Sequence, residues 1–324
     1  MKKIVVILTG GTIAMKIDPT LGAAIPSPIA DELMNNVKAH IKGVYIEERE
    51  IFNIPSPHVD HEKMILIRDE VIKALNEEET IGVIVTHGTD TLEETAYYLD
   101  ITIDNKKPIV VTGAMRNASE LGYDGALNLT ASIATCLNEE SVGLGTLVVM
   151  NNEVHSAAQV TKTNTLSVNT FKSPEFGPLG IIDNDEVLYY RRERSINKCI
   201  IDCLEPKIAL IKMASGIEGD IIDFYIDNNY KGIVIEALGR GNVPPKTVPS
   251  IKRAIDNKIP VVMVSRCSTG RVLGSYGYKG GGRELFSIGV INGGALPGQK
   301  VRIALMALIA ANKNNSEIEE FFKI

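Results

Sequence analysis

The chain has 324 residues, of which 44% are hydrophobic and 23% are charged, the balance of an ordinary globular protein. Its 34 basic and 40 acidic residues give a net charge of −6, so the strongly basic composition of many nucleic-acid-binding proteins is missing. This composition excludes intrinsic disorder and collagen-like repetition. At ~150 residues per domain, the length predicts about two domains.

The N-terminus and the cysteines bear on the cellular compartment. The first apolar run, Ile4–Leu8, is too short for a signal peptide or a membrane span, and no later run reaches the ~18 apolar residues of a span. The cysteines are few and scattered, which is typical of buried thiols in a reducing compartment; they are Cys136, Cys199, Cys203 and Cys267. We therefore expect a cytoplasmic protein without a membrane segment, although a processed secreted protein would have the same sequence features.

Short β-branched runs alternate with longer amphipathic stretches along the chain. The runs predicted as strands are Ile4–Leu8, Gly82–Thr86, Ile109–Thr112, Leu147–Met150, Ile208–Ile211, Gly232–Glu236 and Pro260–Ser265. The stretches predicted as helices are Asp60–Leu75, Thr91–Asp100, Asp124–Leu137, Val248–Asn257 and Gln299–Ala311. Continuous apolar strands are typical of parallel sheets that helices cover on both faces, so the alternation predicts an α/β fold.

A charge-rich segment, Asp185–Asn197, interrupts this alternation. We expect a larger N-terminal α/β domain over residues 1–190, a linker over 191–206 and a smaller C-terminal α/β domain over 207–324. The alternative is that Asp185–Asn197 forms a long surface hairpin inside a single domain.

The first predicted strand ends in Thr9–Ala14 (TGGTIA). Its two glycines permit a tight turn and a close approach of the backbone to a ligand, and Thr12 presents a hydroxyl at the strand end. The turn is not a P-loop and lacks the full dinucleotide-binding spacing. Taken alone, a plain glycine turn is as good an interpretation as a catalytic one.

The strand Gly82–Thr86 ends in His87–Thr91 (HGTDT), directly before a predicted helix. Asp90 or Thr91 could cap that helix, but capping requires only one such residue. Thr89 and Asp90 together supply a hydroxyl, a backbone donor and an anion at one point. Because ligands collect at the carboxyl ends of strands in open α/β sheets, this motif is a candidate for chemistry.

A lysine, Lys162, lies among threonines and an asparagine in Val160–Thr165 (VTKTNT). In most proteins such a lysine is a solvated surface residue. If it were buried beside Asp90, it could relay a proton, since desolvation lowers the pKa of lysine readily. Metal binding is not indicated: His58 and His61, the only close histidine pair, are interpreted as surface or capping residues, and we expect no cofactor.

Several motifs together resemble the bacterial type I/II L-asparaginases, and the match runs in order along nearly the whole chain. TGGTIA and HGTDT form a highly specific pair, whereas either alone would not be. The motifs are Thr9–Ala14, Thr86–Thr91, Thr112–Arg116 (TGAMR) with Asp124 and Gly125, Val160–Thr165, Phe171–Gly180 (FKSPEFGPLG) and Gly289–Gln299.

The resemblance implies a two-domain fold and hydrolysis of the side-chain amide of asparagine, often of glutamine too, through an acyl-enzyme. The nucleophile matches Thr12. Thr89 would serve the water step and the oxyanion, and Asp90 would bind the substrate amine and couple to Lys162. Thr89, Lys162 and Asp90 would then form a hydroxyl–lysine–carboxylate relay, which follows the logic of a triad with lysine in place of histidine.

The resemblance also implies substrate contacts and a homo-oligomer. The positions expected to bind substrate are Gly11, Ser56, Gly88, Thr89, Asp90, Ala114 and Met115. Members of the family form active sites between subunits, so a homodimer or a homotetramer built as a dimer of dimers is expected. Candidates to contribute to a neighbouring subunit's site are Asn242, Tyr276, Tyr278 and Glu284.

The sequence departs from the family pattern in two places. A serine–glutamine or serine–serine pair usually binds the substrate α-carboxylate, but here Ser56 is followed by Pro57, which offers no donor, and by His58, which could compensate or be a mere loop residue. The loop Met15–Pro28 lacks the family's tyrosine near the nucleophile. We expect Tyr276 or Tyr278 of a partner subunit to replace it, the alternative being that both only pack.

These departures leave four interpretations of function. The first is a cytoplasmic L-asparaginase acting on a small-molecule amide, with no nucleic-acid or membrane partner. The second is an amidohydrolase of the same mechanism for glutamine, D-asparagine or a modified asparagine. The third is the amidase-like subunit of a tRNA-dependent amidotransferase, which would need an extra N-terminal RNA-contacting domain. The fourth is a non-catalytic amino-acid-binding sensor, which would not need two hydroxyl positions and a lysine relay.

Overall fold

The computed structural model describes residues 1–18, 20–21, 23–26, 34, 37–38, 41–193 and 196–323. Within it, the chain divides into two compact units, Met1–Ser195 and Ile196–Ile324. Between Tyr189 and Ile208, the described residues form no helix or strand. The described part of the predicted linker, 191–193 and 196–206, therefore lies in irregular backbone.

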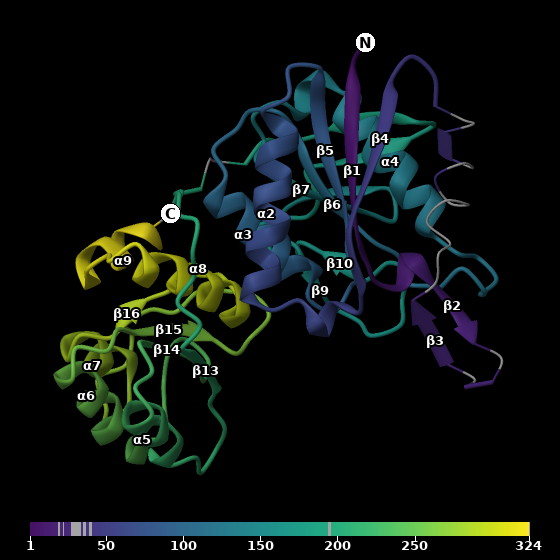
Figure 1. The fold of residues 1–324 in the computed structure, drawn as a ribbon. Helices are drawn as coiled ribbons and strands as arrows, with labels where there is room; N and C mark the ends of the chain where they lie inside the picture. Colours follow the sequence, from purple (N-terminus) through teal and green to yellow (C-terminus); the bar gives the residue numbers. More distant parts are fainter. Residues whose placement is uncertain are drawn as a thin grey trace. The chain divides into compact units, whose positions relative to one another are not determined.

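The first unit is built on an eight-stranded sheet with the order β12-β11-β8-β7-β6-β5-β1-β4 (Figure 1). The five strands from β7 to β4 are parallel, and β8, β11 and β12 are antiparallel additions. The strands are β1 (Lys3–Gly10), β4 (Tyr45–Ile54), β5 (Thr80–Thr86), β6 (Ile109–Thr112), β7 (Thr146–Met150), β8 (Glu153–Ser156), β11 (Gly180–Asp183) and β12 (Glu186–Tyr189).

Helices cover both faces of this sheet, as the apolar strands predicted. Helices α2 (His61–Leu75) and α3 (Leu92–Thr102) lie on one face, and α4 (Gly125–Leu137) lies on the other (Figure 1). Every residue of β1 after Lys3 is buried. Because side chains alternate along a strand, Ile4, Val6 and Leu8 enter the core on the α4 side.

Shorter elements surround the carboxyl ends of the parallel strands. They are two 3₁₀ turns, η1 (Thr12–Ala14) and η2 (Ser56–His58), and two small antiparallel pairs, β2 (Met15–Asp18) with β3 (Ala23–Pro26) and β9 (Thr161–Lys162) with β10 (Phe171–Lys172). A third 3₁₀ turn, η3 (Glu139–Ser141), follows α4.

The second unit is a four-stranded parallel sheet in the order β13-β14-β15-β16, with its own core. Its strands are β13 (Ile208–Lys212), β14 (Gly232–Ala237), β15 (Val261–Ser265) and β16 (Ile291–Asn292). Its helices are α5 (Asp220–Asp227), α6 (Val248–Asp256), α7 (Gly282–Ser287), α8 (Gly298–Ala310) and α9 (Asn315–Phe321), and η4 (Pro245–Thr247) precedes α6.

Two expectations need correction. Asp185–Asn197 is not wholly a break between elements, because its first part forms the edge strand β12, paired to β11 through a tight turn at Asn184 and Asp185. The burial predicted for the cysteines is right for Cys136 and Cys199 and wrong for the other two, which are exposed: Cys203 and Cys267.

Candidate active site

The carboxyl ends of β4, β1, β5 and β6 lie side by side and are joined beyond the regular ladder. Thr9 donates from Oγ1 to the carbonyl of Thr86 at 2.7 Å. The amide of His87 donates to the carbonyl of Thr112 at 2.8 Å, and that of Gly11 to Ile54 at 3.1 Å. The segments that follow these strands therefore start from fixed positions at one edge of the sheet.

The turns after β1 and β5 touch through their glycines. Gly10 and Gly11 have φ values of 95° and 84°, a region that favours glycine. A Cβ on Gly11 would lie 2.3 Å from both the N and Cα atoms of Gly88. The backbone before Thr12 thus packs directly against the backbone before Thr89.

Lys162 connects the two polar residues that follow Gly88. Its Nζ donates to Thr89 Oγ1 at 2.9 Å and to Asp90 Oδ1 at 2.7 Å. Thr89 is only 6% exposed, and the side chains of Lys162 and Asp90 are 16% and 63% exposed. A half-buried ammonium between a hydroxyl and a carboxylate can carry a proton to or from the hydroxyl, which the uncharged alcohol cannot do unaided.

Ser56, at the start of η2, is part of the same cluster. Its Oγ accepts from the amide of Asp90 at 3.2 Å, and its carbonyl accepts from Thr91 Oγ1 at 2.9 Å. A Cβ on Gly88 would lie 2.8 Å from Ser56 Oγ. Since Ser56 Oγ accepts in this contact, its own proton can be donated elsewhere. Pro57 and His58 follow it on the surface.

The side chain of His87 holds the turn that follows β5. It is fully buried, and its Nδ1 donates to the carbonyl of Gly88 at 2.8 Å while its Nε2 accepts from Thr95 Oγ1 at 3.0 Å. Burial lowers the pKa of His87 to about 4, so the ring is neutral at pH 7. The imidazole thereby fixes the peptide that precedes Thr89.

The TGAMR segment after β6 is held by Asp124. Its two carboxylate oxygens accept from the amides of Met115 at 3.1 Å and Arg116 at 3.0 Å. Asn128 of α4 donates to Asp124 and to the carbonyl of Gly113, both at 3.0 Å. These hydrogen bonds hold the backbone around Ala114 and Met115.

One residue at this site was not predicted from the sequence. Tyr123 donates from its hydroxyl to the carbonyl of Ile13, directly after Thr12, at 2.7 Å. A tyrosine in a glycine-containing loop just before a helix was the available signal, but sequence spacing does not show which distant turn such a ring reaches.

The four residues expected to serve a neighbouring subunit all belong to the second unit. Tyr276 and Tyr278 are exposed, and their ring centroids are 5.6 Å apart. Glu284 accepts from the amide of Gly280 at 2.6 Å. Asn242 donates to the carbonyl of Leu238 at 3.4 Å, while its buried Oδ1 has no hydrogen-bond partner.

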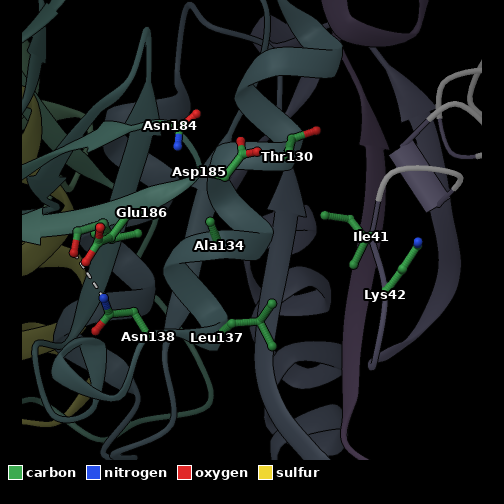
Figure 2. A pocket seen from close by; sticks show the side chains of 10 residues that line it. Ile41, Lys42, Thr130, Ala134, Leu137, Asn138, Asn184, Asp185 and Glu186 are labelled. Carbon is green, nitrogen blue, oxygen red and sulfur yellow. Dashed lines mark hydrogen bonds between the residues drawn. The ribbon is translucent and has the colours of Figure 1, made fainter.

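A surface hollow of about 440 Å³ lies apart from these residues, over α4 (Figure 2). Its lining comes from α4 and the residue after it, the β11–β12 turn, the start of β12 and the segment before β4. Asn138 in this lining donates to the carbonyl of Val187 at 3.1 Å. It contains none of the candidate catalytic residues. The described part of the chain also contains no group of three or more His, Cys, Asp and Glu side chains placed to hold a metal ion.

Comparisons with known proteins cover both units. Residues 3–195 match the family model "Asparaginase, N-terminal", and residues 207–322 match "Glutaminase/Asparaginase C-terminal domain". An L-asparaginase of Bacillus licheniformis is 32% identical over 96% of this chain and 97% of that protein. A probable periplasmic L-asparaginase of Haemophilus influenzae is 34% identical over 100% and 93%.

Other relatives carry a different name. One component of the glutamyl-tRNA(Gln) amidotransferase of Pyrococcus abyssi is 35% identical over 99% of this chain and 75% of that protein. Among solved structures, a probable cytoplasmic L-asparaginase from Campylobacter jejuni matches with a TM-score of 0.87 and 30% identity over 99% of both chains.

The fold and the hydroxyl–lysine–carboxylate cluster at its strand ends define a two-domain α/β protein of the amidohydrolase type. The chain belongs to the asparaginase family, which both of its domains match in order. The resemblance stated from its motifs is thereby confirmed.

Proposed function

We propose that this protein is an L-asparaginase, which hydrolyses the side-chain amide of L-asparagine to L-aspartate and ammonia. The observation that carries the proposal is the bridge from Lys162 to both Thr89 and Asp90, at 2.9 and 2.7 Å. It lies directly after Gly88, the residue that Gly11 contacts. We infer that the two threonines that follow β1 and β5, Thr12 and Thr89, act on one substrate together with the ammonium–carboxylate couple.

In the proposed reaction, Thr12 Oγ attacks the carbonyl carbon of the amide. As the C–O bond forms, the hydroxyl proton is transferred to the amide nitrogen; the C–N bond then breaks, and neutral ammonia leaves the ester behind. Thr89 and Lys162 position and activate the water that hydrolyses the resulting ester and releases aspartate. Backbone amides of the glycine turn and of Thr89 hold the oxyanion, each donor contributing about 3 kcal/mol.

We assign each charged group of the substrate to a residue of the site. Asp90, whose carboxylate is exposed, binds the α-amine, and the Ser56 hydroxyl binds the α-carboxylate. The backbone of Gly11, Gly88 and the Ala114–Met115 segment encloses the amide end. Because Pro57 supplies no donor, the carboxylate has fewer partners from η2 than in the usual family pattern, and His58 is the adjacent side chain that can supply one.

We further propose a cytoplasmic homodimer or homotetramer in which Asn242, Tyr276, Tyr278 and Glu284 reach a neighbouring subunit's site. Two of these residues, Tyr276 and Tyr278, are exposed aromatic side chains, which are common in interfaces. None of the helices in the described ranges has the length and hydrophobicity of a membrane crossing. A catalytically active monomer in sizing chromatography would contradict the oligomer.

Two other activities fit the same site. One is hydrolysis of another small amide, since a methylene of difference in a pocket discriminates by only ~1–3 kcal/mol. The other is suggested by the amidotransferase relative, in which ammonia would pass to a tRNA-linked substrate instead of solution.

Ammonia release from a panel of amides tests the proposal. The panel contains L- and D-asparagine, glutamine, N-acetylated asparagine and peptide-terminal asparagine, with and without glutamylated tRNA and ATP. Fastest release from L-asparagine, independent of tRNA, is the expected result. Binding of asparagine without ammonia release would identify a sensor, and dependence on the charged tRNA would identify an amidotransferase component.

A further inference from the structure

The 3₁₀ turn that carries Thr12 has one internal backbone hydrogen bond, from the amide of Met15 to the carbonyl of Thr12, and is otherwise held from outside. The turn, η1, has three residues and no side-chain cap at its start. Two bonds from the segment after β6 reach it: the Tyr123 hydroxyl donates to the carbonyl of Ile13 at 2.7 Å, and the amide of Ala118 donates to the carbonyl of Met15 at 3.1 Å. The segment from Ala118 to Tyr123 therefore forms hydrogen bonds with the residues on both sides of Ala14.

The position of the Tyr123 ring is specified by its surroundings. A Cβ on Gly125 would lie 2.2 Å from the Tyr123 hydroxyl oxygen, so the ring folds back over a residue without a side chain. Tyr123 also packs against the core cluster that contains Ile13. Burial raises the pKa of Tyr123, and the phenol therefore stays protonated and able to donate.

The same segment sets the loop that encloses the substrate amide. Asp124, the residue after Tyr123, accepts from the amides of Met115 and Arg116 at 3.1 and 3.0 Å. Tyr123 and Asp124 thus connect the turn of Thr12 with the backbone around Ala114.

We propose that Tyr123 is a positioning residue for the nucleophile: its hydroxyl fixes the Ile13 carbonyl and so holds Thr12 in register with the Ala114–Met115 backbone. The inference rests on the proposed function, since it assigns the nucleophile to Thr12. The sequence of the β2–β3 hairpin, which follows the turn, contains no tyrosine. Tyr123 instead brings a hydroxyl of the same chain to the turn of Thr12.

The test compares Tyr123→Phe with Tyr189→Phe. Each substitution removes one hydroxyl from a partly buried tyrosine of the first unit. The Tyr189 hydroxyl, at the end of β12, contacts Ser141 Oγ of η3 at 2.7 Å, and neither residue belongs to the candidate site. We measure kcat and KM for asparagine, the melting temperature, and amide hydrogen exchange of a peptide that covers residues 11–15.

Tyr123→Phe is expected to lower kcat about tenfold, because a small misplacement of a reacting group costs rate. KM should stay within twofold, and exchange over residues 11–15 should become faster. Tyr189→Phe should leave kcat, KM and exchange over residues 11–15 unchanged. Unaltered exchange in Tyr123→Phe, a kcat within twofold of the wild type, or an equal loss in both variants would each overturn the inference.

Failure of the proposed function has a different signature. If the wild-type protein releases no ammonia from asparagine, the proposed function fails, and exchange over residues 11–15 alone decides whether Tyr123 holds the turn. Faster exchange in Tyr123→Phe then supports the inference, and unchanged exchange overturns it.

Discussion

Gly11 lies against Gly88 so closely that a Cβ on Gly11 would be 2.3 Å from the Gly88 Cα. No side chain fits in that distance, so the contact joins the two strand ends through their backbones alone. Each glycine directly precedes a threonine of the candidate site. The spacing between these backbones therefore fixes the distance between the chain segments that carry Thr12 and Thr89.

Gly11→Ala should abolish most of the activity, and Gly43→Ala is its matched control. Gly11 has a φ of 84° and Gly43 a φ of 83°, but nothing lies within 4 Å of a Cβ on Gly43. The positive φ at both positions strains an alanine by about 1–3 kcal/mol, and Gly11 is the more demanding position because its ψ of −177° falls in a region that is essentially restricted to glycine. Only Gly11→Ala also displaces the Gly88 turn, and we expect it to lower kcat/KM at least ~100-fold.

Steady-state rates and melting temperatures of both variants check this prediction. Equal activity in Gly11→Ala and Gly43→Ala would show that the close approach of the two turns is unimportant for the reaction.

Lys162→Met should lower kcat by about 10²–10⁴, since it removes a group that takes part in proton transfer. KM should change little, because Lys162 contacts Thr89 and Asp90 and has no assigned contact with substrate. Lys172→Met is the control: Lys172 lies in the paired strand β10 and forms its ion pair with Glu153 at 2.8 Å. Kinetics in which both lysine variants lose equal activity would contradict the relay.

Asp90→Asn should weaken the binding of asparagine, because the isosteric amide lacks the charge that attracts the α-amine. A hydrogen bond to a charged group contributes ~1.5–3 kcal/mol, which corresponds to an increase in KM of about tenfold or more. Succinamic acid, which is asparagine without its amine, serves as the comparison substrate. The proposed contact predicts a larger loss for asparagine than for succinamic acid, and equal losses would argue against it.

The unfolding free energy should fall as the pH drops from about 6.5 toward 4. Burial lowers the pKa of both His87 and His155 to about 4 from 6.5. In this range the unfolded chain binds protons at these residues and the folded chain does not, so acid favours unfolding. The loss is up to about 3 kcal/mol for each imidazole, and it is absent above pH 6.5.

Urea unfolding at a series of pH values measures this dependence. A His155→Gln variant should show a shallower slope between pH 6.5 and 5 than the wild type. A wild-type unfolding free energy that stays constant over this interval would mean that the two imidazoles are not held neutral by burial.

The elements that the sequence predicts well are the strands that are buried on both faces and the helices with a clear apolar period. The strand over Ile109–Thr112 and the helix start near Asp124 fall within a residue of β6 and α4, because uniform apolar runs and clear helical periods mark them. The strand β4 was missed because it lies at a sheet edge and its interior, Glu47–Glu50, is charged. An edge strand pairs with only one neighbouring strand and tolerates charged residues, so its apolar sequence pattern is weak.

The polar residues of the candidate site could be predicted from the sequence, but the hydrogen bonds that hold its turns in place could not. Thr89, Asp90 and Lys162 stood out as polar residues after apolar strands, and the structure brings them within hydrogen-bond distance. The hydrogen bond of Tyr123 joins positions 110 residues apart in the sequence. Such a contact depends on which turns the fold brings together, and no local pattern encodes it.

Ammonia release by Thr12→Ala tests the central claim most directly. Thr12 lies in η1 and is half-buried, so removal of its hydroxyl should leave the melting temperature nearly unchanged. The account predicts that the variant binds L-asparagine but loses at least ~10³-fold in kcat, since no nucleophile remains to form the ester. Turnover close to that of the wild type would contradict it.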